Sequence, residues 1–482
     1  MFSGLPFHNA LNVCKMLCSM LVCFVLGSIW LAVPHPLVIA VLGLLPLALI
    51  TVLRLPFLVC LGFILFSFFR IHEAFPFLMP FKIPLMLALA SLAALGWHFV
   101  FTKSIRPYTT NELNWFLGFF AIVTIGLVFS TNRGMAIGAF TGSYAKIAIM
   151  VFAIAWLVRT RQEFAITNVM IVVCGILIGV VALQNKANGI GLVEGTRVTI
   201  GRNLGSILGD PNDLALVLSF PVSFAAGMAL TKGLDRWMRV LGVVGFFVIA
   251  SAIIATQSRG GLLAILAVSG VFALAKIKSK LLVLGMGGIA GLALLAMAGI
   301  SGRSSGGAAE EGIDASAAGR LYAWEAALNM ANTHPLTGVG LDNFTVSYFF
   351  YSNHWDGMNH AVHSTWFGVL AETGYIGLIV FITLVVKTVS SIRRLVQQLE
   401  IKYQKNQCPP VLFCSAQSIL AGLAGFCVSG TFLTQGFTWP IYILLALSVA
   451  IKTATVSIVS DCKMQIGSCH SHNAVKGIEK YQ

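Results

Sequence analysis

Charged residues are scarce in this sequence. Lysine, arginine, aspartate and glutamate together fill 10 % of the 482 positions, against about 25 % in a typical soluble domain. Hydrophobic residues fill 57 % of the positions. This balance excludes a soluble globular protein and predicts an all-α, polytopic membrane protein, because helices satisfy their own backbone hydrogen bonds in lipid.

Acidic residues are the rarer of the two charged classes, with 17 against 31 basic residues and a net charge of +14. In a soluble chain such an excess would suggest nucleic acid as a partner. Here the basic residues are scattered between apolar runs and form no continuous stripe, which is the pattern of topology anchors. We therefore expect membrane lipid as a partner and no nucleic acid.

Metal and nucleotide motifs are also missing. The sequence contains no HExxH, and its glycine-rich stretch at 185–210 lacks the lysine-hydroxyl pair of a Walker loop. Four histidines lie between residues 334 and 363, but no aspartate or glutamate is spaced to complete a zinc site with them. Cys469, His470 and His472 could hold a metal, although a disordered tail is the favoured interpretation there. We expect no metal and no cofactor.

Long apolar runs dominate what is present. Fourteen are candidates for crossing a core of about 30 Å at 1.5 Å per residue, and three of them are short, which leaves twelve spans plus a buried hairpin as an alternative. The first run lacks a small-residue cleavage site and reads as a retained helix. The runs lie near 11–33, 35–53, 55–69, 83–101, 113–130, 144–158, 165–184, 211–230, 237–255, 261–275, 281–300, 363–386, 412–434 and 437–452. The short ones are 55–69, 144–158 and 261–275.

Basic residues set the expected orientation. With the N-terminus inside, 21 of the 31 basic residues fall in inner segments and ten in outer ones, so the positive-inside rule places both termini in the cytoplasm. Segment 301–362 is then exterior. None of the ten cysteines falls in a segment expected outside, so no disulfide framework is implied.

These runs divide the chain into five parts. Segment 301–362 is too polar and too long to lie in lipid, because its backbone groups would have no partners there. We expect it to be a large aqueous domain. The other parts are N-terminal transmembrane helices (1–184), transmembrane helices with a glycine-rich exterior loop and the Arg259 turn (185–300), C-terminal transmembrane helices (363–455) and a cytoplasmic tail (456–482).

The exterior segment changes character along its length. Its start, SGRSSGGAA from Ser301, lacks apolar anchors and should be mobile. From Ala318 onward, helical spacing of apolar residues predicts a short amphipathic helix along the membrane surface. Its apolar positions are Leu321, Trp324, Leu328 and Met330. His334-Pro335 should end this helix, because the residue before a proline avoids helical geometry.

Asp210-Pro211-Asn212-Asp213 opens the apolar run at 211–230. Asp210 suits the N-cap and Pro211 the first helical position. Capping is the favoured interpretation, and a substrate contact from Asn212 or Asp213 is the other. Arg202 of the same loop is a further candidate for substrate binding.

Two arginines in expected exterior turns are candidates for binding an anion. Arg259 lies in ATQSRGGLLA between two apolar runs, where it is either an interfacial anchor or an anion site. The following glycines would let a ligand approach the backbone. Arg320 is either paired with Glu325 or another acid, or a second phosphate clamp. Two guanidinium groups from separate segments fit a diphosphate better than a single phosphate.

His363 lies where the chain becomes apolar again, in NHAVHSTWFGVLAETGYIGL. A helix N-terminus disfavours imidazolium, so His363 should stay neutral and able to accept a proton near neutral pH. The alternative is a histidine that caps the helix. His360 and Trp324 are candidate substrate contacts, and Glu372 is either a buried polar group or another such contact.

The order of these motifs resembles the O-antigen ligase and O-antigen polymerase superfamily over about residues 185–385. The resemblance rests on Ser258-Arg259-Gly260-Gly261, Arg320-x-x-x-Trp324, Pro335-x-x-Gly338-x-Gly340, His363-Ser364 and Glu372-x-x-x-x-Gly377-Leu378. The stretch Gly209-Asp210-Pro211-Asn212-Asp213-Leu214 is similar to the O-glycosylation ligase subgroup.

The resemblance implies a GT-C-like helical fold and glycan transfer from an undecaprenyl-diphosphate carrier at the periplasmic face of the bacterial inner membrane. The acceptor would be a hydroxyl of lipid A core, a protein or a growing polysaccharide, and no metal would be needed. By position, Arg259 and Arg320 match the family's diphosphate-binding arginines and His363 matches its base.

Two other classes of function stay open. A transporter or flippase for a lipid-linked or anionic substrate predicts inverted repeats and interrupted helices with charges at mid-membrane; the sequence has few mid-span charges. A scaffold without catalysis is opposed by the concentration of arginine and histidine in segments expected on one face. We therefore expect a ligase or polymerase, which differ only in the acceptor.

Overall fold

The computed structural model describes residues 49–297 and 315–456, with a few isolated positions before residue 49. Regular structure in these ranges is helical, apart from one isolated bridge between Val193 and Arg197. Ten helices among the described residues are long and apolar enough to cross a bilayer. The prediction of an all-α polytopic membrane protein is confirmed. Several predictions lie outside the described residues, apart from a few isolated positions. They are the span at 11–33, the part of the span at 35–53 before residue 49, the start of the 301–362 segment and the tail from residue 457.

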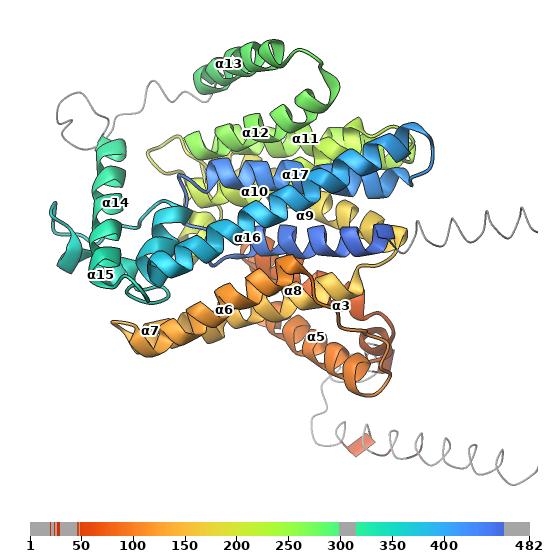
Figure 1. Cartoon of the computed structure of the whole chain (residues 1–482), viewed down its shortest axis with the longest axis horizontal. Coiled ribbons are helices and arrows are strands. Elements are labelled where there is room, and N and C mark those ends of the chain that lie inside the picture. Colours follow the sequence, from red (N-terminus) through yellow and green to blue (C-terminus); the bar gives the residue numbers. More distant parts are fainter. Residues whose placement is uncertain are drawn as a thin grey trace, which may run out of the picture.

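Most helices run side by side along the long axis of the molecule (Figure 1). The N-terminal half contains α3 (Pro56–Phe69), α4 (Ile71–Ala74), η1 (Pro76–Phe81), α5 (Ile83–Val100), α6 (Asn111–Phe129), α7 (Arg133–Ala139), the π-helical turn η2 (Phe140–Tyr144), α8 (Ala145–Leu157) and α9 (Arg161–Ala187).

The second half begins with two short turns that lead into the most buried helix. It contains η3 (Arg202–Leu204), η4 (Ile207–Gly209), α10 (Pro211–Leu230), α11 (Arg236–Ala255), α12 (Arg259–Lys276), α13 (Lys280–Met297), α14 (Ala315–Thr333), α15 (Phe344–Tyr351), α16 (Thr365–Gln404), α17 (Pro410–Ser429) and a final helix, Trp439–Val456.

Helix α10 lies at the centre of this half and packs against α9, α11, α12 and α17. Its neighbours approach closely because they offer glycine at the contacts. A Cβ atom added at Gly175 of α9 would lie 2.6 Å from Pro221 of α10, and one at Gly242 of α11 would lie 2.6 Å from the Ala229 nitrogen. Small residues at such contacts let helix backbones pack tightly in a membrane, where the hydrophobic effect does not drive helices together.

Two predicted helix bounds were wrong in an informative way. The run near 144–158 belongs to a longer helical segment, Arg133–Leu157, that continues through the π turn η2. Helix α16 was expected to end near residue 386 but reaches Gln404. Hydropathy falls where a chain leaves lipid, whereas the lysine, arginine, glutamine and leucine residues that follow are strong helix formers.

Helix α14 crosses one end of the bundle at a steep angle to the other helices, with α15 beside it (Figure 1). As predicted, it ends before His334-Pro335. Its small residues and Met330 face the protein: Ala323, Ala326, Ala327 and Met330 are fully buried, whereas Leu321 is 50 % exposed and Leu328 40 %. Alanines allow α14 to approach α16 more closely than leucines would. The placement of this helix along the membrane surface stays a prediction.

Candidate functional site

Three helices begin at one end of the bundle, each with a side-chain cap. Asp210 accepts hydrogen bonds from the Asn212 and Asp213 amides at α10. Ser258 caps α12 and Ser364 caps α16. The predicted N-cap at Asp210 is confirmed. The N-terminal ends of these helices carry partial positive charge, as at anion sites on helix N-termini.

These helix starts are neighbours in space. A Cβ atom at Gly261 of α12 would lie 2.6 Å from Ala215 of α10. Gly260 faces Leu433, whose carbonyl accepts a hydrogen bond from the Thr365 hydroxyl at 2.7 Å. Arg259 and Thr365, the first residues of α12 and α16, therefore flank the same turn after α17.

The two glycines after Arg259 have different surroundings. Gly261 packs between helices, in a space between Ala215 and Ile253, whereas Gly260 faces Phe432 and Leu433 of the turn after α17 at ordinary contact distance. The approach of a ligand to the backbone at these glycines stays a prediction. Arg259 itself is half-buried and interacts with its surroundings.

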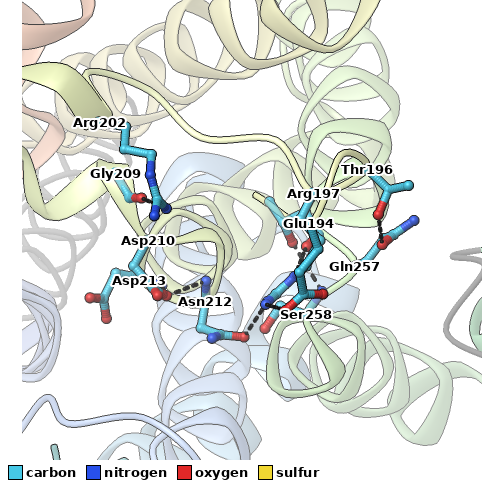
Figure 2. Close-up of polar contacts among 11 residues, drawn as sticks. Glu194, Thr196, Arg197, Arg202, Gly209, Asp210, Asn212, Asp213, Gln257 and Ser258 are labelled. Carbon is cyan, nitrogen blue, oxygen red and sulfur yellow. Dashed lines mark hydrogen bonds and ion pairs between the residues drawn. The ribbon is translucent and has the colours of Figure 1, made fainter. Parts of the chain in front are cut away.

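Arg197 organises the loop beside these helix starts, and sequence reasoning did not single it out. It is 5 % exposed. Its guanidinium donates to the Thr256 carbonyl at 3.2 Å and to the Asn212 side-chain oxygen at 2.9 Å, with Glu194 4.0 Å away (Figure 2). The apolar neighbours Val198 and Ile200, both buried, were the available signal that this arginine faces inward.

Arg202 and Asn212 lie on either side of Asp210 in the same view (Figure 2). Arg202 is exposed, and its guanidinium donates weakly to the Gly209 carbonyl at 3.4 Å. Asn212 is engaged by Arg197. The predicted substrate contacts of Arg202, Asn212 and Asp213 stay predictions, with Arg202 the most accessible of the three.

His363 has a strained backbone. Its φ is +45°, a left-handed conformation that is uncommon outside glycine, asparagine and aspartate and is enriched at functional sites. The conformation is fixed from both sides. The Trp324 indole donates to the Val362 carbonyl at 3.1 Å, and the Thr365 amide donates to the Gly430 carbonyl at 2.7 Å.

His363 is surrounded by charged groups from separate segments. Burial lowers the pKa of its imidazole below the usual 6.5, Arg320 and His360 lower it further, and Asp210 opposes them. Arg320, Asp210 and His360 therefore lie within electrostatic reach of this ring. The direction of this pKa shift agrees with the expectation of a neutral His363, but its largest cause is burial, whereas the sequence argument rested on the helix N-terminus.

The opposing charges predict how activity depends on pH. If catalysis needs neutral His363, the rate falls as pH drops through its lowered pKa, so the acidic limb lies below pH 6.5. Arg320→Gln removes a positive charge and should move this limb to higher pH. Asp210→Asn keeps an N-cap residue and should move it to lower pH. Rate–pH profiles of both variants check the directions of the two shifts. An acidic limb at the same pH in both variants and the unaltered chain would contradict the prediction.

Residues 335–344 are clamped to a break in α16. Gly374 is non-helical, with φ +69° and ψ −172°. A Cβ atom at Gly338 would lie 2.3 Å from the Ala371 carbonyl oxygen, so backbone meets backbone here. The Val339 amide donates to that carbonyl at 2.8 Å, and the Tyr375 amide donates to the Pro335 carbonyl at 2.9 Å.

The other side of the clamped segment rests on the turn before α7. The Thr131 amide donates to the Val339 carbonyl at 3.0 Å, and the Asn132 amide donates to the Asn343 side-chain oxygen at 3.0 Å. The glycine-spaced motif from Pro335 to Gly340 is therefore a docking segment. It fixes α14 and α15, and with them Arg320, relative to α16.

Glu372 belongs to this clamp. It is 9 % exposed, and its carboxylate accepts hydrogen bonds from the backbone amides of Asp342, at 2.9 Å, and Phe344. Two roles were considered for Glu372, and its burial and hydrogen bonds fit the first of them, a buried polar group. A substrate contact from Glu372 stays a prediction.

Trp324 and His360 are engaged by the protein. The Trp324 ring stacks on Phe367 with 5.0 Å between centroids, and its N–H donates to the carbonyl of Val362 in the segment before His363. His360 lies 2.8 Å from an Asp356 oxygen. These contacts position the surroundings of His363, and sugar contacts from either residue stay predictions. Within the described ranges, no three His, Cys, Asp or Glu residues gather in a way that could hold a metal ion.

Residues 244–382 match the model of the O-antigen ligase family. The chain carries an O-antigen ligase domain. No curated protein matches the chain. The matched O-antigen ligase domain contains Arg259, Arg320, His363 and Glu372, whereas Arg197 and its partner Asn212 lie before it.

The O-antigen ligase domain gives the protein a broad class. Together with ten apolar helices it indicates a multi-pass membrane enzyme of the ligase or polymerase type that acts in polysaccharide biosynthesis. Such an enzyme uses a lipid-linked glycan as donor and transfers it to a glycan acceptor.

Proposed function

We propose that this enzyme transfers a glycan from an undecaprenyl-diphosphate carrier to an acceptor hydroxyl at the periplasmic face of the bacterial inner membrane, without a metal ion. The observation that carries the proposal is the placement of His363, a buried histidine with a lowered pKa, within electrostatic reach of Arg320 and Asp210. These three residues lie beside the starts of α10, α12 and α16. Arg259 is the first residue of α12.

The arrangement suits a diphosphate. Arg259 and Arg320 come from different segments and keep their charge at any physiological pH, and guanidinium groups match phosphate oxygens in a bidentate geometry. Helix N-termini add fixed partial positive charge in a partly buried site. These groups would bind the donor and stabilise the charge that develops on the leaving diphosphate.

His363 supplies the complementary base. Its imidazole would accept the proton of the acceptor hydroxyl while that oxygen forms a bond to the anomeric carbon. The bond from the anomeric carbon to the diphosphate oxygen breaks on the opposite face, with inversion. Diphosphate leaves without a strong general acid, so one neutral imidazole and two arginines supply the required groups.

One feature agrees with the transporter alternative: helix α16 is interrupted at Gly374. In transporters, the unwound backbone of such a break lines a substrate cavity. Here the carbonyl of Ala371 and the amide of Tyr375 bond to residues 339 and 335 of the clamped segment. The break therefore serves docking of an aqueous segment, which favours the enzyme.

Glycan analysis of a deletion strain tests the proposal. We expect one surface glycan, in lipopolysaccharide, a secreted polymer or a glycoprotein, to disappear, and its undecaprenyl-diphosphate precursor to accumulate. Complementation with the unaltered chain should restore both. An unchanged glycan profile with no precursor accumulation would contradict the proposal, and the class that loses its sugar identifies the acceptor.

A further inference from the structure

A groove between α3, α5 and α8 has apolar walls and a cationic end, and it is separate from the site around His363. Its volume is about 420 Å³, within the range of about 300–1,000 Å³ of small-molecule sites. Phe63, Ala88, Leu89 and Met150 form its apolar part.

Its cationic end is formed by Arg70 and Lys146, with the imidazole of His72 beside them. Arg70 is paired with Glu73 at 2.6 Å. No ion pair to Lys146 is present within the described part of the chain. The Nδ1 atom of His72 is buried and has no hydrogen-bond partner among the described residues. His72 faces Glu73 through its other ring nitrogen, at 3.6 Å. An exposed ammonium without an ion pair and a buried ring nitrogen without a hydrogen-bond partner among the described residues, both beside an apolar groove, favour an amphiphilic ligand with an anionic headgroup.

The cationic end lies at the same end of the bundle as the candidate active site. Glu73 accepts a hydrogen bond from Ser206, which lies in the loop leading to Asp210. Asp210 in turn is within electrostatic reach of His363. A lipid in the groove would therefore hold its headgroup at the level of the catalytic residues and its chains along the transmembrane helices.

We infer that this groove binds an anionic glycerophospholipid of the bilayer, with its phosphate at Arg70 and Lys146 and an acyl chain along Phe63, Leu89 and Met150. Apolar walls with cations at one end complement such a lipid in both charge and hydrophobicity. A phospholipid is abundant around the protein, so even modest affinity gives high occupancy. The inference does not depend on the proposed reaction.

Native mass spectrometry of the purified full chain tests the inference with three probes: phosphatidylglycerol, diacylglycerol with the same chains, and undecaprenyl phosphate. We expect phosphatidylglycerol to bind more tightly than diacylglycerol, and the difference to shrink at high salt. Lys146→Gln should weaken phosphatidylglycerol binding roughly fivefold. Ala88→Trp should reduce binding of all three lipids, because it fills the groove.

Matched controls keep the result interpretable. Lys82→Gln removes a lysine next to the groove, and Ala93→Trp adds the same bulk to another face of α5; neither residue lines the groove. Both should bind phosphatidylglycerol as the unaltered chain does. Equal binding of diacylglycerol, tighter binding of undecaprenyl phosphate, or unchanged binding in both test variants would overturn the inference. So would an absence of bound lipid.

Discussion

Replacing His363 with asparagine should lower the rate of glycan transfer by at least about 10²-fold while the protein still folds and inserts. Asparagine tolerates the left-handed conformation that His363 adopts at φ +45°, so the backbone should stay in place. It cannot accept the proton of the acceptor hydroxyl. The measurement is turnover of lipid-linked glycan in proteoliposomes, with the unfolding temperature of each variant recorded beside it.

His354→Asn is the matched control for this experiment. His354 is an exposed histidine of the same segment, stacked on Tyr322 with 3.9 Å between ring centroids, and no catalytic role is assigned to it. We expect its turnover to stay close to that of the unaltered chain. Undiminished transfer by His363→Asn would remove His363 from the mechanism.

Gly338→Ala should release the clamp between the 335–344 segment and α16. The new Cβ atom would lie 2.3 Å from the Ala371 carbonyl oxygen, at a φ of +62°. Together, the left-handed strain and the overlap should cost about 3 kcal/mol or more. The Ala371 carbonyl and the Val339 amide would then lose their hydrogen bond, so we expect faster hydrogen exchange at residues 339–344 and lower activity.

Gly189→Ala separates strain from overlap. Gly189 has nearly the same φ, +68°, but nothing lies within 4 Å of its added Cβ atom. This variant should lose only about 1–2 kcal/mol and should leave exchange in the clamped segment unchanged. If the amide hydrogens of residues 339–344 exchange no faster in the Gly338→Ala variant than in the Gly189→Ala variant, the clamp does not depend on the close approach at Gly338.

Much of the fold follows from hydropathy alone. Apolar runs located the long apolar helices that the structure describes, and the Asp210 cap and the His334-Pro335 helix end followed from local rules. The continuation of α16 beyond residue 386 was missed. The end of an apolar run indicates where the chain leaves lipid, but it does not indicate where the helix ends. The contact between α14 and α16 could not be predicted from the spacing of large apolar residues, because alanines make it and allow close approach of the two helices.

The site was predictable in part. Arg320 and His363 could be singled out because both lie in or at the end of the segment expected outside and on the motifs of the resemblance, and the structure brings them within electrostatic reach. Arg197 could not be singled out by charge, since it serves backbone and amide groups that only the fold brings together. The role of Gly338 was equally hidden, because its partner at Ala371 lies 33 positions away in the chain.

Binding of undecaprenyl diphosphate to the purified enzyme tests the central claim most directly. The account predicts that the unaltered chain binds the diphosphate more tightly than undecaprenyl monophosphate. Arg259→Lys and Arg320→Lys should each reduce this preference, because a point charge replaces a bidentate fork, and the double variant should lose about 10-fold or more. Equal affinity for the two lipids, or an unchanged preference in the double variant, would contradict it.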